Sequence, residues 1–332
     1  MNLQRRLAQA ILGTAGFIAA LVPLASLATE VWTPRHPVNL IVPYPPGGVV
    51  DFVARAIAPT VSKDLGVPII VHNRPGASGV IAARSIANAA PDGYTVGFGS
   101  PSTHMVLPAI GMDTQYDPIA DFTPLIKLFE YVTVLAVHPD LPVNSVGELI
   151  ALGKNPATEL FYGTPGSATS FHILGELFNQ TAEIDMTHVP YKGGNDQTIG
   201  LVGGQTQVSF LVLQNVLPFL DDGRIRLLAN FADTKHPAIA NVPLIRDEFP
   251  ELSTDLGWMG IFGPPRLPAP IAQRLAKGFQ AAIISPEVQD KLRDNGLLAI
   301  GHIYQPGEFE QAVNSGQESV KTITSALGIQ AN

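Results

Sequence analysis

The feature that most constrains the fold is a regular alternation between short apolar runs and segments of helical spacing. The runs "VNLIVP" (38–43), "PIIVHN" (68–73) and "TVGFGS" (95–100) are typical of buried strands. Helices are expected between them, and Gly66 can end the first one in the left-handed conformation. This alternation predicts parallel α/β layers rather than repeats or a β-sandwich.

A second α/β series follows the first. It begins with a long β-branched strand in "YVTVLAVHPDLPVNSVGELIAL" (131–152), where Ser145 and Glu148 form a capping box for a new helix. Another long apolar strand, "DLGWMGIFGPP" (255–265), follows this series, so the chain is expected to cross between two lobes twice. The predicted division is domain 1 at 29–133 and 258–332, and domain 2 at 134–257.

The N-terminus is typical of a secretory signal peptide. Arg5 and Arg6 precede an uncharged apolar run, and small residues at Ser26 and Ala28 predict cleavage after Ala28. The run is also long enough for a membrane anchor, but glycines and a proline interrupt it. Cleavage would leave about 304 residues, which is more than one core usually supports and favours two domains.

Charge and cysteine content exclude several classes of function. The formal net charge of −8 becomes about −10 without the two arginines of the leader, which disfavours nucleic acid as a partner. The chain has no cysteine, so it can form no disulfide, no thiolate metal site and no lipid anchor at the cleavage point. We therefore expect a soluble periplasmic protein.

The loops between strands and helices carry the candidate site. Two α/β lobes make a cleft, and ligands in such folds bind beyond the carboxyl ends of the strands. Gly47 and Gly48 let the backbone approach a ligand closely, and the free amides of the helix that begins near Val49 favour a carboxylate. The loops at the strand ends are "PYPPGGVVD" (43–51), "GSPSTHM" (99–105), "GTPGSATSFH" (163–172), "PYKGGNDQ" (190–197) and "VLQNVLP" (212–218).

The order and spacing of several motifs resemble a known family. The stretch from "PYPPGG" to "VGFGS", together with "VPYKGG", "GGQTQV" and "HPDLPVNSVGELI", is similar to the substrate-binding proteins of tripartite tricarboxylate transporters, the Bug family of periplasmic receptors. The resemblance implies a two-lobed periplasmic binding protein fold of type II that closes on a small organic carboxylate. It also implies delivery of the ligand to a membrane permease, and a carboxylate held by loops of both lobes, partly through ordered water.

The resemblance assigns ligand-binding residues one by one. In the first lobe they are Tyr44, Gly47, Gly48, Asp51, Ser100, Thr103 and His104; in the second they are Thr164, Gly166, Thr169, His172, Tyr191, Lys192, Gly193 and Gln214. We expect no cofactor, no metal and a monomer.

Some positions depart from the family pattern. Val49 and Val50 stand where small or hydroxyl residues are common, and Ala168 replaces a frequent glycine. Many relatives read "FDN" where this chain has Phe, Leu and Val at 210–212. Without that acidic group an ammonium would lack its partner, so a more apolar carboxylate is expected in place of an amino acid.

Several candidate residues also have structural interpretations. Asp51 lies in the first turn of a helix, where a carboxylate is favourable without any ligand. His172 fits a buried position within a helix, His104 could serve either role, and Lys192 could be an exposed turn charge. Tyr44 and Tyr191 could simply pack the loops.

An enzyme and a sensor are the alternative functions. The sequence has no G-x-S-x-G, P-loop, G-x-G-x-x-G or H-E-x-x-H motif, and its eight histidines are scattered. Ser167 or Ser170 with His172 could suggest an exported hydrolase, but neighbours on one helix seldom align as nucleophile and base. A receptor that signals to a membrane kinase would have the same sequence features as a transport receptor.

Overall fold

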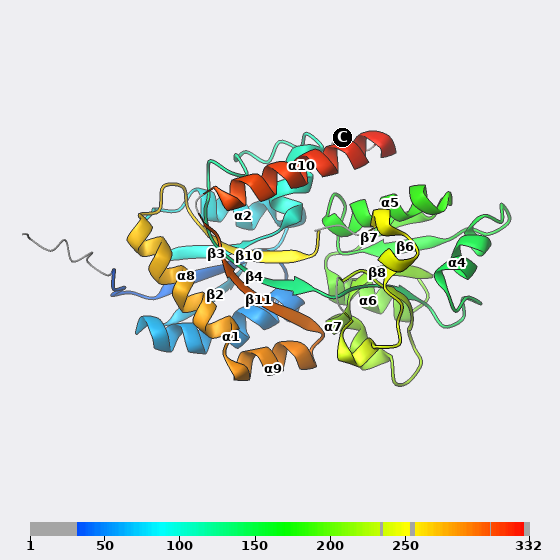
Figure 1. Cartoon of the computed structure of the whole chain (residues 1–332), viewed down its shortest axis with the longest axis horizontal. Coiled ribbons are helices and arrows are strands. Elements are labelled where there is room, and N and C mark those ends of the chain that lie inside the picture. The colour runs from blue at the N-terminus through cyan, green and yellow to red at the C-terminus, as the bar shows by residue number, and fades with distance from the viewer. Residues whose placement is uncertain (1–31, 233–234, 253–255, 306, 329–332) are drawn as a thin grey trace, which may run out of the picture. The chain divides into compact units, whose positions relative to one another are not determined.

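The computed structural model describes residues 32–232, 235–252, 256–305 and 307–328. The expected signal peptide, residues 1–28, lies outside these ranges. Residues 31–332 form one compact unit, in which the strands make two mixed sheets (Figure 1). In the part of the chain that is described, none of the helices combines the length and apolar character needed to cross a bilayer.

The first lobe contains a six-stranded sheet. Parallel β1, β2 and β3 match the three strands predicted from sequence, and β10 then pairs antiparallel with both β3 and β4. The sheet is therefore mixed and not wholly parallel. Its strand order is β11-β4-β10-β3-β1-β2. The bounds are β1 (Val38–Val42), β2 (Ile69–Asn73), β3 (Thr95–Gly99), β4 (Thr123–Tyr131), β10 (Trp258–Gly263) and β11 (Leu297–Ile303).

Helices cover both faces of this sheet. On β10, Met259 and Ile261 face one apolar cluster while Trp258 and Phe262 face another, as strand alternation requires. Helices α1 (Val49–Leu65), α8 (Ala269–Ile283) and α9 (Pro286–Asp294) pack with the first cluster. Helices α2 (Val80–Ala87), α3 (Leu107–Ala109) and α10 (Glu308–Leu327), with the π-helical turn Ser102–Val106, pack with the second (Figure 1).

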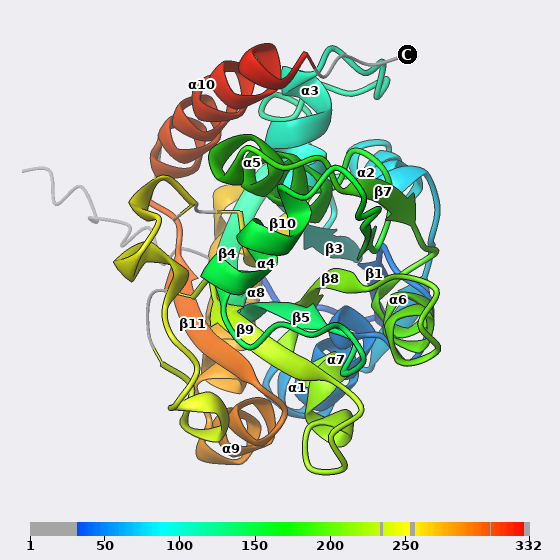
Figure 2. The same cartoon turned by 90° about the vertical axis from the view of Figure 1, so that its right-hand side faces the viewer.

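The second lobe contains a five-stranded mixed sheet of order β7-β6-β8-β5-β9. Its strands are β5 (Thr133–Val137), β6 (Phe161–Thr164), β7 (Thr187–Pro190), β8 (Val208–Val212) and β9 (Arg226–Asn230). Helices α4 (Val146–Gly153) and α5 (Ser170–Ala182) cover one face, and α6 (Gly194–Val202) and α7 (Leu213–Val216) cover the other (Figure 2).

Two connections join the lobes side by side. One is Val132, between β4 and β5, and the other runs from β9 to β10. The amide of Tyr131 donates to the carbonyl of Gly257 at 2.7 Å. The amide of Phe231 donates to the carbonyl of Thr133 at 2.8 Å. Two adjacent connections that are hydrogen-bonded to the chain beside them at the lobe boundary suit a hinge.

Local helix signals are confirmed where the structure tests them. Gly66 ends α1 in the left-handed conformation, with φ of 75°. The Ser145 side chain accepts a hydrogen bond from the amide of Glu148 at the start of α4. Both features were predicted from the sequence.

Candidate functional site: a pocket between the two sheets

A pocket of about 160 Å³ lies where the strand-to-helix loops of the two lobes meet. Pockets for drug-sized ligands usually have 300–1,000 Å³, so this space suits a smaller molecule. The lining residues are Tyr44, Pro45, Pro46, Gly48, Val49, Val50, Tyr131, Pro165, Phe171, Lys192, Gly193, Gly194, Asn195, Asp196, Gln197, Val212 and Asn215.

The N-terminus of α1 provides donors to this pocket. The amide of Gly47 is already used, since it donates to Asp51 Oδ2 at 2.9 Å, and the amide of Gly48 turns toward Pro45 O at 3.4 Å. The first helical bond joins the amide of Phe52 to Gly48 O, so the amides of Val49 and Val50 precede the helical ladder. The amides suited to an anion therefore lie one to two residues beyond the two glycines.

Asp51 holds the loop before α1. Its carboxylate is buried and accepts hydrogen bonds from Arg55 Nε at 3.0 Å and Asn73 Nδ2 at 3.0 Å, besides the Gly47 amide. Burial alone would raise the pKa of Asp51, but these hydrogen bonds and the Arg55 charge together lower it below its usual value. The contacts of Asp51 support its structural interpretation, because its oxygens serve the chain and it does not line the pocket.

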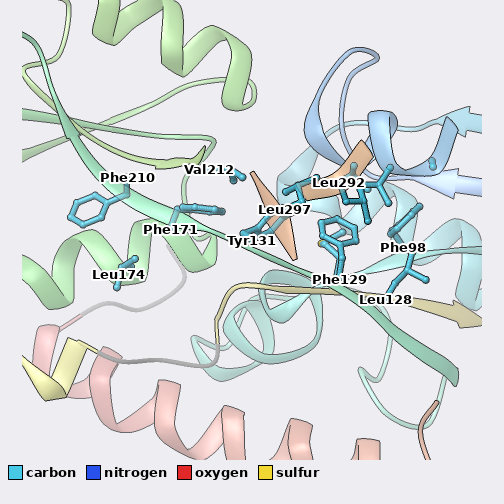
Figure 3. Close-up of a cluster of buried hydrophobic side chains, with 14 of the residues drawn as sticks. Phe98, Leu128, Phe129, Tyr131, Phe171, Leu174, Phe210, Val212, Leu292 and Leu297 are labelled. Atoms are coloured by element: carbon cyan, nitrogen blue, oxygen red, sulfur yellow. The ribbon is translucent and has the colours of Figure 1, made fainter. Parts of the chain in front are cut away.

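Aromatic residues form the apolar floor of the pocket. The ring of Tyr131 at the end of β4 lies 5.9 Å from that of Phe171 in α5, so a residue of each lobe contributes (Figure 3). Val212, also labelled there, completes this side with Val50. Tyr44 is hydrogen-bonded to Ser100, and burial raises the pKa of Tyr44 to about 12. Its hydroxyl therefore stays neutral at physiological pH.

A polar wall faces the α1 N-terminus. It comes from the start of α6 and from α7, and it contains three side-chain amides and two charged groups. Asn195 Nδ2 donates to Gly47 O at 3.2 Å, which links this wall to the loop of the first lobe. The loops "PYKGGNDQ" and "VLQNVLP" were predicted to meet at the cleft, but Asn195, Gln197 and Asn215 were not among the predicted ligand-binding residues. A signal was present, since the two short loops together contain four amide residues that are available for hydrogen bonding.

Two further hydrogen bonds join the lobes beside the pocket. Ser78 Oγ donates to Ser167 O at 2.6 Å, and the amide of Ser170 donates to Ser102 Oγ at 3.0 Å. Ile173 of α5 is fully buried in the apolar cluster of α2 and α10 in the first lobe. The contact between α5 and α10 also includes a hydrogen bond, which Gln180 Nε2 donates to Ala326 O at 3.4 Å.

The predicted residues of the loop after β3 are buried and do not line the pocket. Thr103 Oγ1 is 2.9 Å from His104 Nδ1, and the His104 ring stacks on Phe262 at 4.5 Å. Burial lowers the pKa of His104 to about 4. Of this loop, Ser100 is nearest to the pocket lining through its bond to Tyr44. Thr103 and His104 therefore pack within the first lobe beside Phe262 and do not line the pocket.

The predicted residues of the second lobe shape a neighbouring loop. Gly166 has φ of 151°, and its carbonyl accepts from Thr164 Oγ1 at 3.0 Å and Thr169 Oγ1 at 2.8 Å. Thr164 Oγ1 also lies 2.6 Å from His188 Nε2, whose ring stacks on His172 at 4.0 Å. These residues fix the loop that includes Pro165, which does line the pocket.

The remaining predicted residues divide between the pocket and its surroundings. Tyr44, Gly48, Lys192 and Gly193 line it. Tyr191 donates to Gln205 Oε1 at 3.4 Å, outside the lining. Gln214 does not line the pocket, whereas its neighbour Asn215 does. Gln214 Oε1 is buried and has no hydrogen-bond partner among the described residues. The described residues contain no group of three or more His, Asp or Glu side chains suited to a metal ion.

The fold and the pocket define a class, that of two-lobed α/β periplasmic binding proteins. The chain belongs to the family described as tripartite tricarboxylate transporter family receptors, whose model matches residues 53–323. A UPF0065 protein from the gbd 5' region of Cupriavidus necator is 31% identical over 300 residues, covering 87% of this chain and 88% of that protein. Protein BugT of Bordetella pertussis is 29% identical over 305 residues, which cover 90% of this chain and 91% of that protein. The resemblance found from motifs is confirmed.

Solved structures share the fold. One described as a periplasmic transporter superposes with a TM-score of 0.82 at 33% identity, covering 90% of this chain and 99% of that chain. Rpa4515 of R. palustris with adipate superposes with a TM-score of 0.81 at 30% identity, and the match covers 90% of this chain and 99% of that chain. MatC of Rhodopseudomonas palustris with bound malate superposes with a TM-score of 0.78 at 28% identity, and the match covers 87% of this chain and 99% of that chain.

Proposed function

We propose that this protein is a periplasmic receptor that binds a small organic carboxylate between its two lobes and carries out no chemistry of its own. The observation that carries the proposal is the N-terminus of α1, where the amides of Val49 and Val50 are free of helical bonds at the pocket. Backbone amides and the helix dipole both favour an anion at that point. The adipate and malate of two similar structures support the choice of a carboxylate.

Binding would couple to movement of the two lobes. We propose that residues 29–133 and 258–332 form one domain and 134–257 the other, which agrees with the strands found in each sheet. A carboxylate at α1 that also contacted the lining residues of the second lobe would stabilise the arrangement in which Asn195 is hydrogen-bonded to Gly47. The closed form would then be the shape that a membrane partner recognises.

The partner follows from the family. A receptor of this family would deliver its ligand to the membrane subunits of a tripartite tricarboxylate transporter. Export through the signal peptide at 1–28 would place the mature chain, as a monomer, in the same compartment as that permease.

A thermal-shift screen of the mature chain tests the function. The panel contains benzoate, propionate, succinate, adipate, malate, citrate, aspartate and glutamate at equal concentration. An acid at about 100 times its dissociation constant adds about 2.7 kcal/mol and should raise the melting temperature by several degrees. A panel in which no carboxylate shifts the melting temperature, while the chain unfolds cooperatively, would contradict the proposal.

A further inference from the structure

The loop between β6 and α5 contains a residue in an unfavourable backbone conformation. Ala168 has φ of 54°, in the left-handed region, which is disfavoured for a residue with a Cβ atom. The same residue packs, partly buried, against the apolar cluster of α2 and α10 in the first lobe. A glycine would adopt this conformation without strain but would lose that apolar contact. A residue held in such a conformation needs support from the structure around it.

His172 provides that support. Its Nδ1 accepts a hydrogen bond from the amide of Ala168 at 3.2 Å. His172 is the third residue of α5, and its own amide donates to the side chain of the N-cap residue, Thr169, at 3.3 Å. The arrangement is similar to a capping box, in which a side chain of the first helical turn reaches back to an amide at the N-cap. Here the side chain reaches one residue further, to Ala168.

The surroundings of His172 keep Nδ1 an acceptor. The titratable neighbours of the ring are His188 of β7, which stacks on it at 4.0 Å, and Glu176, whose Oε1 lies 3.7 Å from Nε2 and accepts from the hydroxyl of Tyr162. Burial lowers the pKa of His172, although the charge of Glu176 opposes this. The ring is therefore neutral at pH 7, with its proton on Nε2 toward Glu176 and its lone pair on Nδ1 toward Ala168.

The peptide group that His172 holds also contacts the first lobe. The amide of Ala168 and the carbonyl of Ser167 belong to one planar peptide group, so fixing one fixes the other. The amide donates to His172, and the carbonyl accepts from Ser78 Oγ of the first lobe at 2.6 Å. Pro165 of the same loop lines the pocket. One peptide plane thus connects His172, inside the second lobe, to a hydrogen bond between the lobes.

We propose that His172 is a positioning residue for lobe closure, which orients the Ser167–Ala168 peptide group so that its carbonyl accepts from Ser78 of the first lobe. Without this acceptor the left-handed conformation of Ala168 loses its support, and the peptide group turns away from Ser78. The arrangement with the lobes together is then less populated. Resting on the proposed function, a carboxylate between the lobes binds more weakly, because affinity scales with the population of the competent arrangement. His172 itself does not line the pocket.

His172→Asn and His172→Leu are the matched variants that test the contact. Both side chains branch at Cγ and have the same shape, but only Oδ1 of asparagine accepts in the place of Nδ1. Hydrogen exchange on the mature chain without ligand, resolved at single amides, is the measurement. We expect the amide of residue 168 to exchange at least about tenfold faster in His172→Leu than in the native chain. The rate in His172→Asn should stay close to the native one, and equal rates in the two variants would overturn the inference.

Ala168→Gly tests whether the contact acts by positioning. Glycine adopts the left-handed conformation without strain, so in this background the peptide group keeps its orientation without His172. Calorimetry uses the acid that gives the largest shift in the thermal-shift panel. We expect His172→Leu to weaken binding at least about threefold in the native background, as loss of a hydrogen bond does, and to have no measurable effect in the Ala168→Gly background. Ser78→Ala should weaken binding by a similar factor, and His172→Leu should add little to it.

The outcomes keep this inference apart from the proposed function. If no acid of the panel binds, the proposed function fails, and exchange at residue 168 still decides whether His172 holds the loop. If an acid binds, an affinity unchanged in His172→Leu, or a loss that persists in full with Ala168→Gly, would overturn the positioning role. A His172→Leu chain that folds only together with Ala168→Gly would support the role, and one that folds in neither background would overturn it.

Discussion

The carboxylate of Asp51 accepts a hydrogen bond from the amide of Gly47 at 2.9 Å, and this contact sets the path of the chain into α1. Gly47 has φ of 80°, a conformation that costs little only for glycine. Once its amide is bonded to Asp51, the next unpaired amides along the chain are those of the first helical turn. Asp51 therefore acts on the pocket through the loop and not by contact.

Replacing Asp51 by Asn should destabilise the first lobe. The native carboxylate accepts charge-assisted hydrogen bonds, so we expect a loss of about 2 kcal/mol in the free energy of unfolding. Because the pKa of Asp51 is lowered in the folded state, its contribution is present above the unfolded pKa and is lost as pH falls through the folded value. Denaturant unfolding at pH 7 and below pH 4 measures both effects. An equal loss at the two pH values, or none in comparison with the exposed Glu310→Gln, would contradict this role.

Acid sensitivity should also arise from His188. Burial, and then the neighbouring His172, lower the pKa of His188 to about 3. A histidine whose folded pKa is lowered contributes stability above its unfolded pKa near 6.5, and loses it as pH falls toward the folded value. Between pH 7 and pH 5 we expect a loss on the order of 1 kcal/mol that His188→Gln removes. Denaturant midpoints at both pH values test this, with Thr187→Ala as the control. An unchanged pH slope in His188→Gln would disprove it.

The chemistry of the loops was easier to predict than the residues that line the pocket. Sequence patterns gave the α/β class, Gly66 as a helix end and the loops that meet at the site. They missed β4 and β11, which are strands through antiparallel pairing with partners distant in the sequence. The choice between Gln214 and Asn215 depends on which way a single turn of α7 faces, which no local pattern specifies.

Export should yield a mature protein that begins at Thr29. The charged start, the apolar run and the small residues at the cleavage point predict removal of residues 1–28. N-terminal sequencing of protein from periplasmic extract checks the position. Recovery of an intact Met1 in the membrane fraction would show that the segment is an anchor.

The central claim, that a carboxylate binds at the start of α1, is tested most directly by calorimetry on Gly48→Val with the acid that binds best. Gly48 lines the pocket with φ of −78°, which any residue adopts, and an added Cβ would lie 3.4 Å from Pro45 O. The variant should therefore fold, and circular dichroism and the melting temperature verify that it does. We predict that the side chain blocks the anion and weakens binding at least a hundredfold, about 2.7 kcal/mol. Unchanged affinity in the folded variant would place the ligand elsewhere and contradict the account.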